Sequence, residues 1–146
     1  MIHDVKIHPL KVFTSNEGSL LHLLRSDSPL FKKFGEVYIS TIMNRSIKAW
    51  KLHLKMEQNL VVAQGKVRFV FYDPRKESPS YGQIQEIILS RQNYSLLQIP
   101  AKIWYGFQGE SNGESLLVNC ATIPHSSEEI ERLPAQTELI PYRWIS

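Results

Sequence analysis

Short segments in which apolar or β-branched residues alternate with polar ones recur along most of this 146-residue sequence. In residues 36–42, for example, Val37, Ile39 and Thr41 share one face of an extended strand, and the residues between them share the other. Seven further segments of this kind follow, at 49–54, 59–64, 66–73, 84–90, 94–99, 102–107 and 115–123. So many short strands with little helix between them predict an all-β antiparallel sandwich or barrel, including the jelly-roll type.

Turn and capping residues divide these segments. Gly65, between two apolar runs, predicts a tight hairpin. One short helix is predicted at 28–35, with Ser28 as its N-cap and Gly35 as its stop. A second is predicted at 126–133, where Ser126 and Glu129 have capping-box spacing.

Size and charge exclude several classes of protein. The length suits one domain spanning residues 1–146, and 42% hydrophobic residues can build a packed core. The net charge is only +3 and the cations are scattered, which argues against a nucleic-acid partner. No apolar run approaches the roughly 18 residues of a membrane span, so no membrane partner is expected.

The single cysteine, Cys120, cannot form a disulfide within the chain, and it lies in an apolar strand-like segment. The start of the sequence lacks the uninterrupted apolar stretch of a signal peptide. We therefore expect a cytoplasmic protein.

One predicted strand carries polar chemistry on a single face. Lys51, His53 and Lys55 lie on one side, opposite the apolar side chains of the same strand. This row suits a solvated edge strand. It also suits the wall of a cavity in which lysines hold an anion and His53 transfers protons. In that second arrangement the flanking lysines disfavour the imidazolium, so His53 can act as a base, whereas a diphosphate bound to the lysines would reverse this effect.

Tyr105 is the second candidate in this chemistry. Ile103 and Tyr105 share one face of their strand, and Trp104 lies on the other. Tyr105 is either a core aromatic residue or the acid that complements His53. The sequence contains no GxSxG, P-loop or GxGxxG motif, and no cofactor is expected.

Several blocks of sequence, taken in order, resemble a known family. They are GSLLHLLRSD, GEVYISTI, WKLHLKMEQNLVVAQGKVRFVFYD, SPSYGQIQEIILS, YSLLQIPAKIWYGF and IPYRW, which together span residues 17–145. They resemble the cupin-fold dTDP-4-dehydrorhamnose 3,5-epimerase superfamily, and HLKMEQ is also similar to the sugar 3,4-ketoisomerases.

The resemblance implies a double-stranded β-helix jelly roll, usually a homodimer, that acts without metal on a nucleotide-linked 4-keto-6-deoxyhexose. Epimerisation there removes a proton next to the ketone and returns one to the opposite face. His53 falls on the family's catalytic histidine. The family's other functional positions are substituted: Lys51 and Tyr105 stand at histidine positions, and the catalytic tyrosine falls near Val118. The family's paired carboxylate is also not found, since no aspartate follows Asp73.

The cupin metal pattern is depleted as well. His53 and Glu57 fall on two of its ligand positions, but Lys51 and Tyr105 replace the other two histidines. Two donors do not make a tight metal site, so no metal is expected.

Two main hypotheses follow. The first is an epimerase or isomerase of nucleotide-linked keto sugars, with His53 as base and Tyr105 as acid. The second is a non-catalytic cupin that binds a sugar nucleotide or a related glycan precursor, which the missing tyrosine and carboxylate favour. A generic partner-binding β-domain is a third possibility. The residues expected to contact substrate are Arg45, Lys48, Lys51, Glu57, Arg68 and Trp104.

Overall fold

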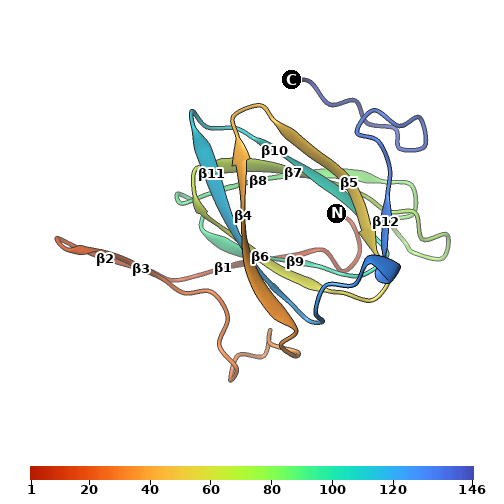
Figure 1. Ribbon diagram of the computed structural model, residues 1–146. Coiled ribbons are helices and arrows are strands. Elements are labelled where there is room, and N and C mark those ends of the chain that lie inside the picture. Colours follow the sequence, from red (N-terminus) through yellow and green to blue (C-terminus); the bar gives the residue numbers. More distant parts are fainter.

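The computed structural model describes residues 1–146 and consists of two five-stranded antiparallel sheets that face each other (Figure 1). The first sheet has the strand order β1-β9-β6-β11-β4, with bounds Lys6–Pro9, Ser95–Ile99, Gln58–Gln64, Glu114–Ala121 and Glu36–Met43. The second has the order β12-β5-β10-β7-β8, with bounds Ile130–Arg132, Ile47–His53, Trp104–Gly109, Lys66–Tyr72 and Ile84–Ser90. This architecture confirms the predicted all-β jelly roll.

A separate two-stranded hairpin, β2 (Val12–Ser15) with β3 (Gly18–Leu21), projects from the body of the molecule (Figure 1). Its side chains are mostly exposed, and they include Phe13 and Leu20.

The central core lies between the two sheets, because each strand turns its apolar alternate residues inward. Phe69, Phe71, Leu97 and Ile99 are among its fully buried members. Tyr105 also belongs to this core. The alternation read from the sequence therefore places the inner row of β10 correctly.

The outer face of the second sheet is covered by the C-terminal segment. Trp50 and Val70 of the sheet pack there against Ile140 and Trp144. Gly106 makes this packing possible, because a Cβ at that position would lie 2.4 Å from Ala49 Cβ and 3.0 Å from Trp144 Cζ2.

Three local predictions are wrong, the first at Gly65 and the others at residues 28–35 and 126–133. Gly65 does not form a hairpin, because β6 and β7 lie in different sheets and the chain turns a corner between them. The corner needs glycine: its φ is +82°, and a Cβ would lie 2.2 Å from Ser115 Oγ.

Residues 28–35 form no helix. Leu30 instead packs beside Val61 and Leu96 on the outer face of the first sheet. The Gly35 amide donates to the Ala121 carbonyl at 2.8 Å, which leads the chain in extended form into β4. A segment this short has little helical stability of its own, so tertiary contacts decide its conformation.

The predicted C-terminal helix is reduced to one three-residue 3-10 turn, η1 (Ser127–Glu129), followed directly by β12. Ser126 makes no side-chain capping bond, so Glu129 is not part of a capping box. No helix in the structure is long and apolar enough to span a membrane.

Candidate active site

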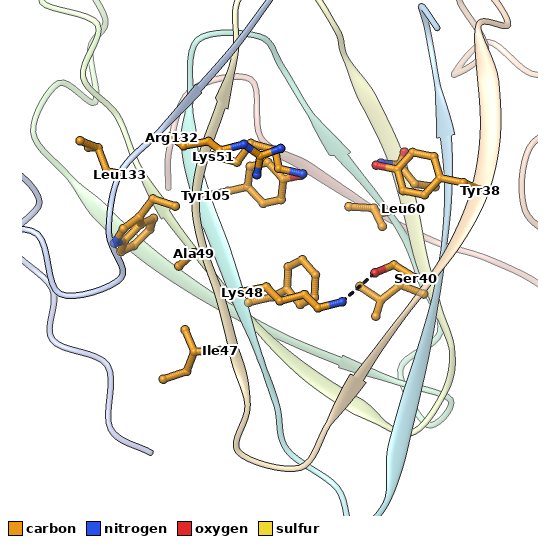
Figure 2. A pocket seen from close by; sticks show the side chains of 14 residues that line it. Tyr38, Ser40, Ile47, Lys48, Ala49, Lys51, Leu60, Tyr105, Arg132 and Leu133 are labelled. Carbon is orange, nitrogen blue, oxygen red and sulfur yellow. Dashed lines mark hydrogen bonds between the residues drawn. The ribbon is translucent and has the colours of Figure 1, made fainter. Parts of the chain in front are cut away.

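A cavity of about 440 Å³ lies between the two sheets, where β4 and β11 face β5 and β10 (Figure 2). The second sheet lines it with polar side chains of Lys48, Lys51, Tyr105 and Arg132. The first sheet lines it with Tyr38, Ser40, Leu60, Leu117 and Asn119. None of the lining residues is acidic.

A bulge in β5 decides which of its side chains face this cavity. Tyr105 pairs with Lys51 and Phe107 pairs with Lys48, so the one residue of β10 between these pairs opposes two residues of β5. In a regular strand, positions 48 and 51 would point to opposite faces. The extra residue brings both lysines to the cavity.

His53 ends β5 on the inner side and is buried, with 4% of its surface exposed. Its Nδ1 lies 2.5 Å from Oε1 of Glu129, a residue brought alongside by the turn η1 and by the pairing of β12 with β5. The second carboxylate oxygen of Glu129 accepts the backbone amides of Lys55 and Met56, each at 3.1 Å. The carboxylate is thus fixed by three donors.

The two pKa shifts agree with a neutral imidazole beside an ionised carboxylate. Burial lowers the pKa of His53, and it outweighs the hydrogen bond and the negative charge of Glu129, which raise it. Burial also opposes ionisation of Glu129, but the bonds from His53 and from the two amides together lower the pKa of its carboxyl. A carboxylate can only accept, so Nδ1 carries the proton and Nε2 has a free lone pair.

That Nε2 atom is buried and has no hydrogen-bond partner. The imidazole is stacked on Tyr105, with ring centroids 6.4 Å apart. His53 is not itself one of the cavity's lining residues, but its neighbours Tyr105 and Lys51 are. A buried basic nitrogen left unpaired next to a polar cavity costs folding free energy, and such groups cluster where function requires them.

Three cations gather on the same wall of the cavity. Arg132 pairs with Lys51 across β12 and β5, and Lys48 follows on the other side of the bulge (Figure 2). Burial, and then the charges of Arg132 and Lys48, lower the pKa of Lys51. Because no lining carboxylate balances these cations, the cavity favours an anionic ligand.

A chain of hydrogen bonds runs from Tyr105 of the second sheet to the facing wall. Tyr105 Oη donates to Gln58 Oε1 at 2.9 Å, and Asn119 Nδ2 donates to the same oxygen at 2.8 Å. Asn119 Nδ2 also donates to Tyr38 Oη at 2.8 Å. The Tyr105 proton is therefore engaged, whereas Tyr38 only accepts within this chain.

The other predicted substrate residues lie outside the cavity. Arg45 and Arg68 line a separate cleft, where Arg68 is paired with Glu110 at 2.7 Å and with Glu86 at 3.1 Å. Glu57 is paired with Lys32 at 2.5 Å. Trp104 packs on the outer face of its sheet, in the cluster around Trp50.

Three residues of the site were missed from the sequence. Glu129 supplies a carboxylate to His53, a role for which the sequence offers no late aspartate. Arg132 lines the cavity from a segment that the sequence predicts to be helical. Tyr38 was placed on a strand face without a role. The alternation of residues 36–42 does put Tyr38 and Ser40 on one face, and this was the only signal available.

Nowhere in the chain do three or more His, Cys, Asp or Glu side chains gather in an arrangement that could hold a metal ion. Of the two cupin ligand positions retained in the sequence, His53 is bonded to Glu129 and Glu57 to Lys32.

Comparison with known proteins assigns this arrangement to a family. The family model described as dTDP-4-dehydrorhamnose 3,5-epimerase matches residues 2–144. A probable low-salt glycan biosynthesis epimerase, Agl13 of Haloferax volcanii, is 31% identical over 143 residues, covering 97% of this chain and 88% of that protein. The spore coat polysaccharide biosynthesis protein SpsL of Bacillus subtilis is 25% identical over 146 residues, covering 99% and 97%.

Among solved structures, a dTDP sugar isomerase from Desulfovibrio desulfuricans G20 superposes with a TM-score of 0.96 at 40% identity. The match covers 98% of this chain and 92% of that one.

Proposed function

Because this chain belongs to the dTDP-4-dehydrorhamnose 3,5-epimerase family, we propose that it is an epimerase or isomerase of a nucleotide-linked 4-keto-6-deoxy sugar. The reaction proposed is metal-independent proton transfer at a carbon next to the ketone. The observation that carries the proposal is the buried His53–Glu129 pair. Nε2 of His53 is left without a hydrogen-bond partner beside a cationic cavity.

His53 is the base in this scheme. Glu129 holds the Nδ1–H tautomer, which directs the Nε2 lone pair away from the carboxylate. When Nε2 takes the carbon-bound proton, the imidazolium formed is stabilised by the adjacent carboxylate. Contacts of this kind are often long in the ligand-free enzyme and tighten when substrate binds.

The cations have two tasks. Lys48, Lys51 and Arg132 provide positive charge for the diphosphate of the nucleotide. The same charge lowers the energy of the enolate that forms when the proton leaves.

The test is deuterium washout. The protein is incubated in heavy water with a dTDP-4-keto-6-deoxyhexose, and the C3 and C5 protons are followed by NMR. We expect exchange in the wild-type chain and in His3→Ala, a control at an exposed histidine, and no exchange in His53→Ala.

Two other outcomes would refute the proposal. Saturable binding without exchange would identify a non-catalytic sugar-nucleotide binder. Absence of binding by any nucleotide sugar would leave only the fold in common with the family.

We also propose that the partner in solution is a second copy of this chain. The projecting β2–β3 hairpin exposes Phe13 (54%) and Leu20 (61%), and the edge strand β4 exposes Ile39 (65%). Large apolar side chains at a sheet edge and on an arm of this kind suit a protein interface. We further propose that the protein is cytoplasmic. Its single cysteine, Cys120, has no second thiol in the chain, which agrees with a reducing compartment.

A further inference from the structure

We propose that Tyr38 donates the proton to the face of the sugar opposite His53, and that Asn119 positions it. This inference rests on the proposed function, since it assigns the second proton carrier of the same reaction.

The position of Tyr38 provides the first argument. It lies on β4 of the first sheet, across the cavity from Lys51 and Arg132 of the second (Figure 2). His53 lies two residues beyond Lys51 in the second sheet. A ring held between the two sheets thus presents one face toward the base and the other toward Tyr38.

The cavity wall formed by the first sheet offers few other proton donors. Among the cavity residues of the first sheet, only Tyr38 and Ser40 carry a hydroxyl; the others are Leu60, Leu117 and Asn119. A phenol is a far stronger acid than an aliphatic hydroxyl or an amide. Ser40 also lies beside Lys48, whose Nζ is 3.5 Å from its Oγ. Tyr38 is therefore the one efficient proton donor on this wall.

The direction of the hydrogen bonds provides the third argument. Asn119 and Tyr38 are directly paired in the register of β11 and β4. Because Asn119 Nδ2 donates to the Tyr38 oxygen, the phenolic proton remains free for a ligand in the cavity. Tyr105 has the reverse arrangement, since its proton goes to Gln58 and its side chain is buried.

The ionisation of Tyr38 agrees with this role. Burial raises the pKa of its phenol, as does the charge of Glu36, whereas the bond from Asn119 lowers it. The hydroxyl is therefore protonated at neutral pH. The side chain is 36% exposed, so water can restore its proton after each transfer.

The step balances without an added oxidant or reductant. The carbon next to the ketone loses its proton to His53 Nε2, and the electron pair passes into the enolate. The carbon then gains a proton from the Tyr38 hydroxyl on its other face, which leaves a phenolate. Water reprotonates the phenolate and accepts the proton from the imidazolium.

The experiment compares exchange with inversion in Tyr38→Phe. In heavy water with the dTDP-4-keto-6-deoxyhexose, this variant should still wash deuterium into the substrate through His53, returning it to the same face. Inverted product should fall by roughly 10²–10⁴-fold relative to exchange.

Tyr105→Phe tests the other phenol of the cavity. Because Tyr105 stacks on His53, we expect its loss to slow exchange and inversion together, and to lower thermal stability because Gln58 Oε1 loses one of its two donors. Tyr81→Phe is the matched control, because Tyr81 is exposed and outside the cavity, and it should change neither rate. Asn119→Asp tests the positioning: its carboxylate would accept the Tyr38 proton, so inversion should fall while exchange continues.

The outcomes separate the two proposals. If Tyr38→Phe inverts substrate as often per exchange event as the wild type, or if Tyr105→Phe alone loses inversion, the assignment of Tyr38 is wrong and the proposed function stands. If the wild-type chain catalyses no exchange, the proposed function fails and this assignment fails with it.

Discussion

His53 Nδ1 and Glu129 Oε1 lie 2.5 Å apart although the two residues are separated by 76 positions in the chain. The contact exists because β12 pairs with β5 and sets Ile130 opposite His53. The turn η1, held in place by the short strand β12 that follows it, thus supplies the carboxylate of the proposed acid–base pair.

Replacing Glu129 by Gln should remove most of the activity while preserving the fold. The amide oxygen can still accept from the backbone of Lys55 and Met56, but an amide NH₂ facing Nδ1 stabilises the tautomer in which Nε2 carries the proton. We expect the exchange rate to fall by roughly 10²–10⁴-fold. Washout kinetics together with a circular dichroism melt measure this, and an unchanged rate would show that Glu129 does not orient the base.

Acidification should inactivate the enzyme only below the range usual for histidine. His53 must be neutral to accept a proton, and burial lowers its pKa below the ordinary 6.5. In a profile of kcat/KM for exchange against pH, the acid limb should therefore have its midpoint below 6.5, with a plateau above it. A midpoint above 6.5 would mean that the carboxylate outweighs burial.

Loss of cavity charge should weaken nucleotide binding. Lys48→Ala and Lys51→Ala each remove a charged donor, worth about 1.5–3 kcal/mol, which corresponds to roughly 10- to 100-fold in Kd. Titration calorimetry with dTDP provides the measurement. Lys55→Ala is the control, because Lys55 is exposed and outside the cavity, and its Kd should not change. Equal losses in all three variants would indicate a general charge effect.

Gly106→Ala should destabilise the protein through its outer face. The added methyl would lie 2.4 Å from Ala49 Cβ and 3.0 Å from Trp144 Cζ2, and overpacking of this kind costs about 1–3 kcal/mol. Urea unfolding measures the loss. In the double variant with Ala49→Gly, part of it should be recovered, since the nearest clashing atom is removed. If the changes in unfolding free energy of the two single variants simply add in the double variant, the predicted contact is wrong.

The proposed homodimer can be tested at the hairpin. Ser in place of Phe13 and Leu20 removes two exposed apolar side chains from β2 and β3 and should shift the protein toward the monomer in sedimentation velocity. Leu139→Ser is the control, since Leu139 is more exposed (71%) than either hairpin residue but lies on the C-terminal segment. A wild-type chain that sediments as a monomer would refute the interface.

Local sequence patterns predicted the strands and the faces that their side chains occupy. The strands and the inner position of Tyr105 follow from alternation, because a two-residue period fixes which side chains meet the core. Alternation also placed Lys51 and His53 on one face, and both point inward. Lys48 was expected to contact substrate because of its charge, but alternation did not place it on this face, since a bulge has no periodic signature.

Features decided by distant contacts were not predictable in the same way. Gly65 looks like a hairpin turn until the partners of β6 and β7 are known. Residues 28–35 carry helix caps but form only a turn from Ser28 to Phe31, and their contacts with the first sheet decide this conformation. Glu129 has capping-box spacing, yet its real partner is His53. In each case the deciding neighbour is remote in sequence, and no short motif encodes it.

The site is complete only when β12, near the end of the chain, has paired with β5. Leu133 exchanges backbone hydrogen bonds with Trp50, and Trp50 Nε1 donates to the Ala135 carbonyl. Ribosomes build chains from the amino end, so the histidine emerges long before the glutamate that orients it. A nascent or C-terminally clipped chain that ends before Glu129 would retain nearly all of both sheets but would lack the carboxylate that orients His53. Turnover would therefore begin only after this last segment has been synthesised.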